Sequence, residues 1–347
     1  MVDVWLDTVT PKDSLLIYSL LPSLREKGHK TIITAKRQTQ TTDVLDLLKI
    51  PYTCVGKYGE TLKEKLAEEQ RRTLQFIELF DKTGLPKILW THGDVSAIRT
   101  AFGLQIPIVY SNDTIHAFHV ARLVCPLVDW LVAPLCFGKS WSKFGISKSK
   151  IVLYDGVEEA AWLRKPKQGI KLPKELLDKE RIVLFRNVEY KAAYCKDVKV
   201  DAMRLVKELS KMAAVVYLPR YEEEREQLKG LDNVWIPSRT ILTFQIVPAL
   251  DLVVGSGGSI CRETALMGVP TINFHFWDVI PRYLHKKGFP IQYSNDTERI
   301  VKIARKILKN PEKHKMNTDC MLRKLEYPVP VTVSLMEKCL EDTRDSG

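Results

Sequence analysis

Short apolar runs alternate with amphipathic segments along most of the chain. In the first half, the apolar runs predict strands at residues 2–6, 31–35, 52–55, 88–90, 106–110, 130–133 and 151–154. The segments between them have apolar residues at helical spacing and predict helices at residues 14–27, 43–49, 62–81, 97–102 and 118–124. Strands that alternate with helices through short connections are typical of a parallel, doubly wound α/β sheet.

The same alternation resumes after residue 180. The predicted strands are at residues 182–185, 214–218, 234–236, 252–254 and 271–274. The predicted helices are at residues 202–211, 222–229, 243–249, 259–268, 281–287 and 297–309. The tail over residues 311–340 also has a helical pattern, and Pro328 and Pro330 are expected to break it.

A polar stretch separates the two halves. Residues 158–180 are rich in Lys, Pro and Glu and show little periodicity, so we interpret them as a crossover between domains. We expect an N-terminal Rossmann-like domain at residues 1–157 and a C-terminal Rossmann-like domain at residues 158–325. A helical tail at residues 326–347 could pack back on the N-terminal domain.

The composition is that of an ordinary globular protein. A length of 347 residues favours two domains, and the hydrophobic content is 45% and the charged content 27%. Because no apolar run approaches the ~20 residues of a membrane helix and no signal peptide is recognisable, we expect a cytoplasmic protein. The seven cysteines are scattered without a C-x-x-C motif and are expected to be reduced thiols.

The net charge of +11 favours an anionic partner, such as a phosphorylated substrate, an acidic lipid surface or a nucleic acid. No zinc finger or arginine-rich tract is present, so dedicated nucleic-acid binding is not expected. Trp141 and Phe144 stand among several lysines and could form a surface that contacts an anionic membrane; a solvated face is the alternative. The lysines are Lys139, Lys143, Lys148 and Lys150.

The most specific candidate site follows the predicted strand at residues 252–254. It is a glycine-rich turn formed by Gly255, Ser256, Gly257, Gly258 and Ser259. Glycines permit a sharp turn and the close approach of a ligand, and Ser259 is expected to cap the next helix. Free N–H groups at a helix N-terminus favour a phosphate, and the Glu263 carboxylate could accept hydrogen bonds from ribose hydroxyls. A turn that serves packing alone remains the alternative.

Polar residues also follow the predicted strands of the first half, where parallel sheets bind ligands. They are Asp7, Lys12, His92, Asp94, Asn112 and Asp113. Asp94 is a candidate general base or sugar ligand, and a helix cap is its alternative role. His116 beside Asp113 is a second acid/base candidate. His116 and His119 are too few ligands for a metal site, so neither a metal ion nor another cofactor is expected.

Four residues of the second half complete the candidates. Arg186 and Arg220 follow predicted strands and could bind a diphosphate, with surface salt bridges as the alternative. Asp278 and Arg282 follow the strand after the glycine turn and could face a sugar.

Several of these motifs resemble enzymes of the GT-B architecture. Residues 88–94 (ILWTHGD), 106–108 (IPI) and 129–134 (DWLVAP) resemble segments of the non-hydrolysing UDP-GlcNAc 2-epimerases, as does Ser256-Gly257-Gly258. The spacing from Gly257 to Glu263 is closer to that of the MurG-type N-acetylglucosaminyltransferases. The whole chain most resembles an archaeal family of unknown function, DUF354.

The resemblance implies two Rossmann-like domains with an inter-domain cleft that binds a nucleotide-diphospho sugar such as UDP-GlcNAc. Asp94 matches an acid/base aspartate of the epimerases, and Asn112 or Asp113 falls near their next carboxylate. No carboxylate stands at residues 116–118, and Phe185 stands where the epimerases have a histidine. We therefore expect a glycosyltransferase, with an altered 2-epimerase and an inactive binding or scaffold protein as alternatives. A lipid-linked acceptor, peripheral contact with the inner face of the membrane and a homodimer remain open.

Overall fold

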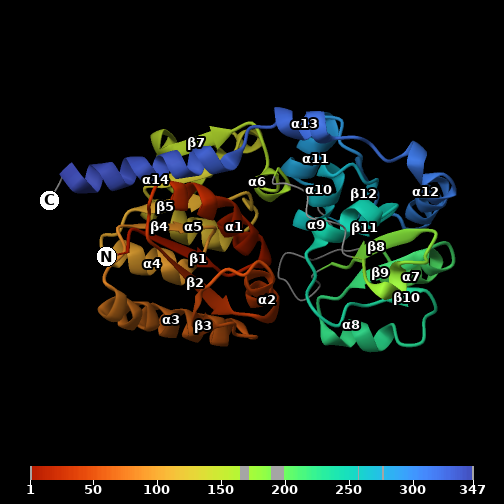
Figure 1. Ribbon diagram of the computed structural model, residues 1–347, viewed down its shortest axis with the longest axis horizontal. Helices are drawn as coiled ribbons and strands as arrows, with labels where there is room; N and C mark the ends of the chain where they lie inside the picture. Colours follow the sequence, from red (N-terminus) through yellow and green to blue (C-terminus); the bar gives the residue numbers. More distant parts are fainter. Residues whose placement is uncertain (1, 165–171, 189–198, 257, 276, 346–347) are drawn as a thin grey trace. The chain divides into compact units, whose positions relative to one another are not determined.

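The computed structural model describes residues 2–164, 172–188, 199–256, 258–275 and 277–345 (Figure 1). The chain divides into two compact units. Unit 1 contains Met1–Trp162 and Leu325–Gly347, and unit 2 contains Leu163–Lys324. No helix among the described residues has both the length and the apolar character needed to cross a membrane.

Unit 1 contains a seven-stranded parallel sheet in the order β3-β2-β1-β4-β5-β6-β7. Its strands are β1 (Val4–Thr8), β2 (Thr31–Arg37), β3 (Thr53–Lys57), β4 (Ile88–Thr91), β5 (Ile108–Ser111), β6 (Trp130–Pro134) and β7 (Ile151–Tyr154). Its helices are α1 (Pro11–Glu26), α2 (Thr39–Leu47), α3 (Leu62–Thr83), α4 (Val95–Gly103), α5 (Phe118–Val124), α6 (Ala160–Leu163) and α14 (Pro328–Asp345). Short 3-10 turns lie between α5 and β7.

The first strand and helix meet closer together than the sequence predicts. The predicted strand ends at residue 6 and the predicted helix starts at residue 14, but β1 runs to Thr8 and α1 starts at Pro11. Asp7 lies inside the strand because its carboxylate accepts a hydrogen bond from Thr34 and pairs with Arg72. Helix α1 begins where Thr10 and Asp13 form a capping box, since the side chain of each binds the backbone N–H of the other.

The chain returns to unit 1 through α14, which lies against α1 and strands β4 to β6 (Figure 1). The predicted break at Pro328 is confirmed in its position, since α13 (Asp319–Lys324) ends before it and α14 begins at Pro328, whereas the predicted break at Pro330 is wrong. Both prolines lie in the first turn of α14, where the backbone N–H groups have no partner inside the helix and a proline is therefore tolerated.

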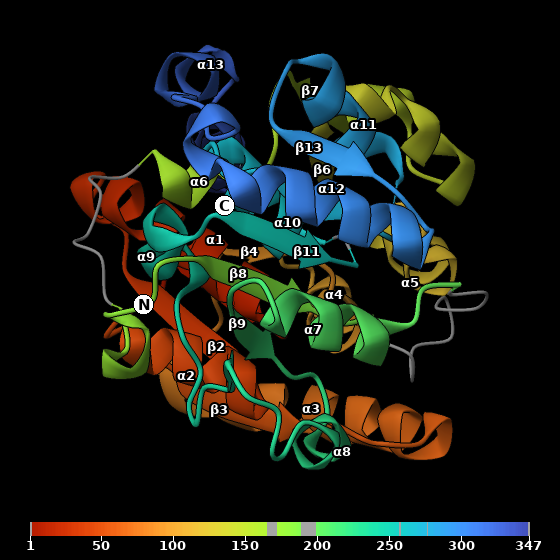
Figure 2. The ribbon, with the colours of Figure 1, turned by 90° about the vertical axis from the view of Figure 1, so that its right-hand side faces the viewer.

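Unit 2 contains a six-stranded parallel sheet in the order β10-β9-β8-β11-β12-β13. Its strands are β8 (Ile182–Arg186), β9 (Ala214–Leu218), β10 (Val234–Trp235), β11 (Leu252–Gly255), β12 (Thr271–Asn273) and β13 (Ile291–Tyr293). Its helices are α7 (Ala202–Ser210), α8 (Glu222–Gln227), α9 (Thr243–Ile246), α10 (Ser259–Leu266), α11 (Val279–Lys286), α12 (Thr297–Lys309) and α13 (Asp319–Lys324). Helices α7 and α12 pack side by side over one face of this sheet (Figure 2).

Two parallel sheets, each combined with helices, confirm the predicted fold class of two Rossmann-like α/β domains. Strand β13 is absent from the prediction.

Candidate functional site

The carboxyl ends of β1, β4, β5 and β7 bring six ionisable side chains together in unit 1. We call them the unit 1 cluster: Lys12, Asp13, His92, Asp113, Glu158 and Glu159. Parallel strands place their carboxyl ends at one edge of the sheet, so residues from distant parts of the chain meet there. Each of these side chains is at most 11% exposed.

Lys12 is the cation at the centre of this cluster. Its Nζ atom forms a salt bridge with Asp113, lies 2.5 Å from Oε2 of Glu158 and 3.7 Å from Oε1 of Glu159. The residue lies between Thr10 and Asp13, the two members of the capping box of α1, so a fixed helix end positions it. The three carboxylates around this buried ammonium compensate for part of its lost hydration.

His92 is the second cation. Its Nε2 atom is 2.9 Å from Oε2 of Glu158, and its Nδ1 atom is 3.1 Å from Oδ1 of Asp13. Burial lowers the pKa of His92, but Glu158 and Asp13 outweigh burial and raise this pKa to about 10. The imidazole is therefore protonated at neutral pH. Asn112 fixes the loop, since its Nδ2 atom donates to the carbonyl of His92.

The cluster contains four carboxyl groups and two cations. One ligand atom each of His92, Asp113 and Glu158 lies within 4.8 Å of the others, which is a spacing that a metal ion could bridge. In this structure the Lys12 ammonium contacts two of the three residues and compensates the negative charge at that position.

A second buried group lies beside this cluster. Arg72 of α3 is fully buried, and its guanidinium is 2.7 Å from Asp7 and 2.5 Å from Asp94. It also donates to the carbonyl of Val55. Burial raises the pKa of Asp7 to about 6, against the opposing effect of Arg72. The guanidinium thus connects β1, β3 and the start of α4.

The structure shows the alternative role of Asp94. Its Oδ1 atom accepts a hydrogen bond from the backbone N–H of Ala97, which makes Asp94 the N-cap of α4. The catalytic role of Asp94 stays a prediction, because its described contacts are the cap and the ion pair with Arg72. His116 is half-buried, and its acid/base role stays a prediction.

The sequence prediction missed Asp13, Glu158, Glu159 and Arg72. Residues up to Trp162 belong to unit 1, so the two glutamates lie in this unit and not in the predicted crossover. The two glutamates could have been found because they lie between β7 and the apolar residues of α6, which indicates burial. For Arg72 the indication was weaker: it lies four residues before Phe76, on the buried face of α3.

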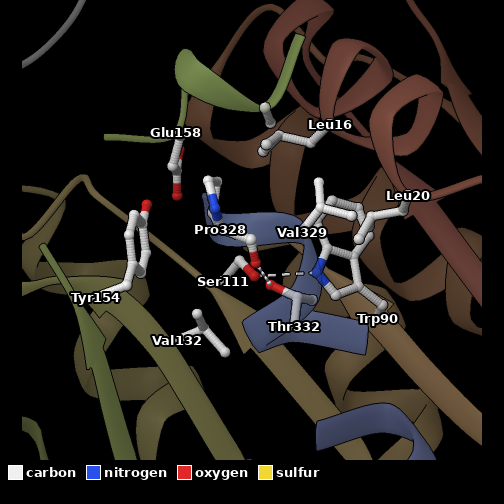
Figure 3. Close-up of a pocket in the computed structure, with 11 residues that line it drawn as sticks. Leu16, Leu20, Trp90, Ser111, Val132, Tyr154, Glu158, Pro328, Val329 and Thr332 are labelled. Carbon is white, nitrogen blue, oxygen red and sulfur yellow. Dashed lines mark hydrogen bonds between the residues drawn. The ribbon is translucent and has the colours of Figure 1, made fainter. Parts of the chain in front are cut away.

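A small cavity lies next to Glu158 (Figure 3). Its volume is about 10 Å³, which is room for about one water molecule, and apolar side chains of α1 and α14 form much of its lining. Figure 3 shows the hydroxyl of Tyr154 pointing toward Glu158. This hydroxyl is buried and has no hydrogen-bond partner among the described residues. Burial raises the pKa of Tyr154 well above its ordinary value, so the group is neutral.

The protonation of His92 leads to a pH-dependent stability. Because folding raises its pKa from 6.5 to about 10, its contribution is fully present below pH 6.5 and is lost as the pH rises through 10. At pH 6 the wild type should be more stable than His92→Gln. We expect this difference in the free energy of unfolding to be smaller at pH 10.5 by roughly 3–5 kcal/mol. Urea denaturation of both proteins at the two pH values measures it. A difference that does not change with pH would contradict a charged His92.

In unit 2 the predicted glycine turn links β11 to α10. Gly258 has φ +74°, a conformation that L side chains rarely adopt, and no atom lies within 4 Å of where a Cβ would be. The predicted cap by Ser259 is wrong: α10 begins at Ser259, and its N-cap is Gly258, which has no side chain. Among the described residues, the N-cap position of α10 therefore supplies no side-chain hydrogen bond to the amide groups at this end. Gly257 lies outside the described residues.

Neighbouring strand ends hold this turn in place. The Ser256 hydroxyl donates to the carbonyl of Asn187 at 2.9 Å, and Arg186 lies in register with Gly255. Arg186 itself donates to the carbonyl groups of Leu218, the last residue of β9, and Pro219, at 2.9 and 2.8 Å. Arg220 donates through Nε to the carbonyl of Asn187. The predicted diphosphate contacts of both arginines stay predictions, and their described hydrogen bonds fix the loops around the turn.

The remaining candidates differ in exposure. Glu263 is buried on α10, Asp278 is half-buried at the start of α11, and Arg282 is exposed. The predicted aromatic surface is wrong as far as Trp141 and Phe144 are concerned. These rings are 0% and 6% exposed and pack together at a centroid distance of 6.0 Å, so they belong to the core of unit 1.

Comparison with known protein sequences shows which family this chain matches. The sequence profile of a family described as "Protein of unknown function (DUF354)" matches residues 2–340. An uncharacterized protein of Methanocaldococcus jannaschii is 26% identical over 312 residues, which are 86% of this chain and 90% of that protein. The predicted resemblance to this family is confirmed.

Solved structures agree on the architecture. The UDP-GlcNAc 2-epimerase of Methanocaldococcus jannaschii, in complex with UDP-GlcNAc and UDP, matches with a TM-score of 0.66 at 15% identity, over 94% of this chain and 95% of that chain. The spinosyn forosaminyltransferase SpnP matches with a TM-score of 0.63 at 14% identity, over 98% and 99%. Identities this low show the fold alone, and that fold is GT-B, as predicted.

Proposed function

We propose that this chain, which belongs to the DUF354 family of proteins of unknown function, is a glycosyltransferase with a nucleotide-diphospho sugar as donor. A UDP-linked sugar such as UDP-GlcNAc is the expected donor. The observation that carries the proposal is the turn before α10, whose amide groups lie at a helix N-terminus with Gly258 as the cap. A protein of the same fold was solved in complex with UDP-GlcNAc and UDP.

On the nucleotide side, unit 2 would bind the diphosphate through the backbone of residues 256–259. Amide N–H groups and the dipole of α10 would stabilise the negative charge that develops on the leaving diphosphate. Glu263 would accept hydrogen bonds from the ribose hydroxyls. Arg186, Arg220 and Asp278 are further candidates around the same strand ends, in roles that stay predictions.

On the acceptor side, unit 1 would supply the proton acceptor. In glycosyl transfer the acceptor oxygen forms a bond to the anomeric carbon, the bond from that carbon to the diphosphate breaks, and the acceptor hydroxyl loses its proton. We assign this proton to Asp113, the carboxylate of the unit 1 cluster on the loop after β5. Lys12 and His92 would compensate the negative charge of the carboxylates around Asp113.

One observation argues against the epimerase alternative. At the position where the resemblance expects the epimerase histidine, Phe185 is fully buried and stacks on Tyr217 and Phe274 at 5.5 and 5.9 Å. That position therefore belongs to a hydrophobic core. In favour of the epimerase, the unit 1 cluster contains several acid/base groups, which a reaction with two proton transfers needs.

Incubation with UDP-GlcNAc separates the hypotheses. UDP released only when an acceptor is added supports a transferase, whereas UDP-ManNAc formed without an acceptor supports an epimerase. Binding without turnover supports a scaffold protein. A thermal-shift screen of nucleotide sugars should come first, since a ligand of the native state raises the melting temperature. No shift with any nucleotide sugar would contradict the proposal.

Replacing Glu263 tests the ribose contact. We expect Glu263→Ala to weaken UDP binding by ~1–3 kcal/mol, because a hydrogen-bonded carboxylate is lost. Isothermal titration calorimetry measures the affinity. Glu298→Ala, at an exposed position of α12 in the same unit, is the matched control and should leave the affinity unchanged. Equal affinities for Glu263→Ala and the wild type would remove the assigned role.

A further inference from the structure

Helix α3 exposes an unusual number of apolar side chains. Among the described residues, thirteen large apolar side chains are exposed, and six of them lie between Tyr58 and Leu85. Four are on α3 itself: Leu62, Leu66, Leu74 and Ile77, with exposed fractions of 84%, 62%, 61% and 41%. Globular monomers seldom leave a contiguous apolar surface of this kind in water, so such a surface usually marks an interface.

These four side chains share one face of α3, and we call them the α3 stripe. Leu62 and Leu66 are one turn apart, and Leu74 and Ile77 are neighbours at a spacing of three. Leu66 and Ile77 are eleven residues apart, which is three helical turns. Arg72 and Phe76 are buried in unit 1 on another face of the helix, and Phe80, five turns after Leu62, is buried in the direction of the edge of the stripe.

Charged side chains flank the stripe in a self-complementary order. Lys63 near the start of α3 and Asp81 near its end are exposed, and neither has an ion-pair partner among the described residues. They are eighteen residues apart, which is five turns, so both point in the same direction from the helix axis, between the directions of Ile77 and Leu74. An ammonium at one end and a carboxylate at the other end become complementary when a second copy runs in the opposite direction.

We propose that the α3 stripe is the interface of a homodimer, in which two copies of α3 pack antiparallel. A twofold axis beside residue 72 places Lys63 of each copy level with Asp81 of the other copy. The same axis brings Leu66 of one copy within one residue of Ile77 of the other, so the apolar side chains of both copies interdigitate. A twofold axis generates each contact twice, which is the usual geometry of soluble homo-oligomers.

The charges of α3 favour a second copy over a lipid surface. The helix carries five acidic and five basic side chains, whereas the whole chain has a net charge of +11. Glu64, Glu78 and Asp81 are exposed on this helix, and an anionic bilayer would repel them. A neutral helix with separated charges suits an antiparallel partner of the same sequence.

The first test is the mass of the protein in solution. Sedimentation equilibrium of the full chain should give twice the mass calculated from the sequence. The double variant Leu66→Glu, Ile77→Glu should raise the dissociation constant by about 100-fold or more, because it places carboxylates in the apolar centre. Leu123→Glu, at a position of α5 with 54% exposure, is the matched control and should remain a dimer.

The second test uses the charges. Lys63→Asp alone should weaken the dimer by about 10-fold, because it opposes two carboxylates at both ends of the interface. The double variant Lys63→Asp, Asp81→Lys should restore the wild-type dissociation constant. Both substitutions suit the helix dipole, since they place an acid near the start and a base near the end of α3, so folding is not at risk.

Three results would overturn the proposal. One is a wild-type protein that stays monomeric at the highest soluble concentration. Another is a dimer whose dissociation constant is the same in the Leu66→Glu, Ile77→Glu variant as in the wild type, or a Lys63→Asp, Asp81→Lys variant that dimerises no more tightly than Lys63→Asp alone. The third is a monomer that sediments with anionic lipid vesicles and loses this binding in the Leu66→Glu, Ile77→Glu variant. Thermal unfolding of each variant verifies that unit 1 remains folded.

Discussion

Replacing Arg72 by methionine is expected to lower the free energy of unfolding by ~3–5 kcal/mol. The substitution keeps much of the apolar stem but removes the charge that compensates Asp7 and Asp94, both of which are buried. Two buried carboxylates would then repel each other without a cation, and Val55 would lose the donor to its carbonyl group. Urea denaturation at pH 7, followed by tryptophan fluorescence, measures the loss.

The neighbouring residue gives a matched control for this prediction. Arg71 is exposed and pairs with Glu68 one turn away, so Arg71→Met should change the free energy of unfolding by no more than about 0.5 kcal/mol. The loss in Arg72→Met should also become smaller as the pH falls below 6, because protonation then removes the charge on Asp7, whose pKa burial raises to about 6. Similar stabilities for the two variants would mean that Arg72 contributes through its methylene groups alone.

The backbone architecture could be predicted from the sequence because strands and helices have local signals. The strand at residues 252–254 is apolar at every position, and its observed counterpart β11 is fully buried. Errors arose where a polar residue lies inside a regular element. Asp7 has the side chain of a loop residue but belongs to β1, because its partners Thr34 and Arg72 come from elsewhere in the chain.

The candidate site could be predicted in part only. The carboxyl ends of parallel strands are a topological expectation, and Lys12, His92 and Asp113 meet there as that rule requires. Glu158 contacts His92 although it lies 66 residues further along the chain. No local sequence pattern indicates which strand ends are neighbours in the sheet. Arg72 was hidden for the same reason, since its function depends on which face of α3 is buried.

Replacing Asp113 by asparagine is expected to have the largest effect on activity. Asparagine keeps the shape and the hydrogen bond with Thr114 but cannot accept the proton of an acceptor hydroxyl. We expect turnover to fall by about 10²–10⁴-fold, the usual contribution of a general base. The UDP affinity should stay within about twofold of the wild type, because the proposed nucleotide contacts come from residues 256–263 in unit 2. UDP release with acceptor and calorimetric titration with UDP measure the two quantities.

The split between these two quantities distinguishes catalysis from folding. Asp113 forms a salt bridge with Lys12, so its loss also disturbs the charge balance of the unit 1 cluster. Lys12→Met removes the other half of that pair and leaves the proposed base in place, so a smaller loss of turnover in Lys12→Met than in Asp113→Asn would favour the base role. Asp46→Asn, at an exposed position of α2, should behave as the wild type. If Asp113→Asn retains turnover while Lys12→Met abolishes it, the proton acceptor is a different carboxylate, and Glu158, 2.5 Å from the Lys12 ammonium, becomes the next candidate.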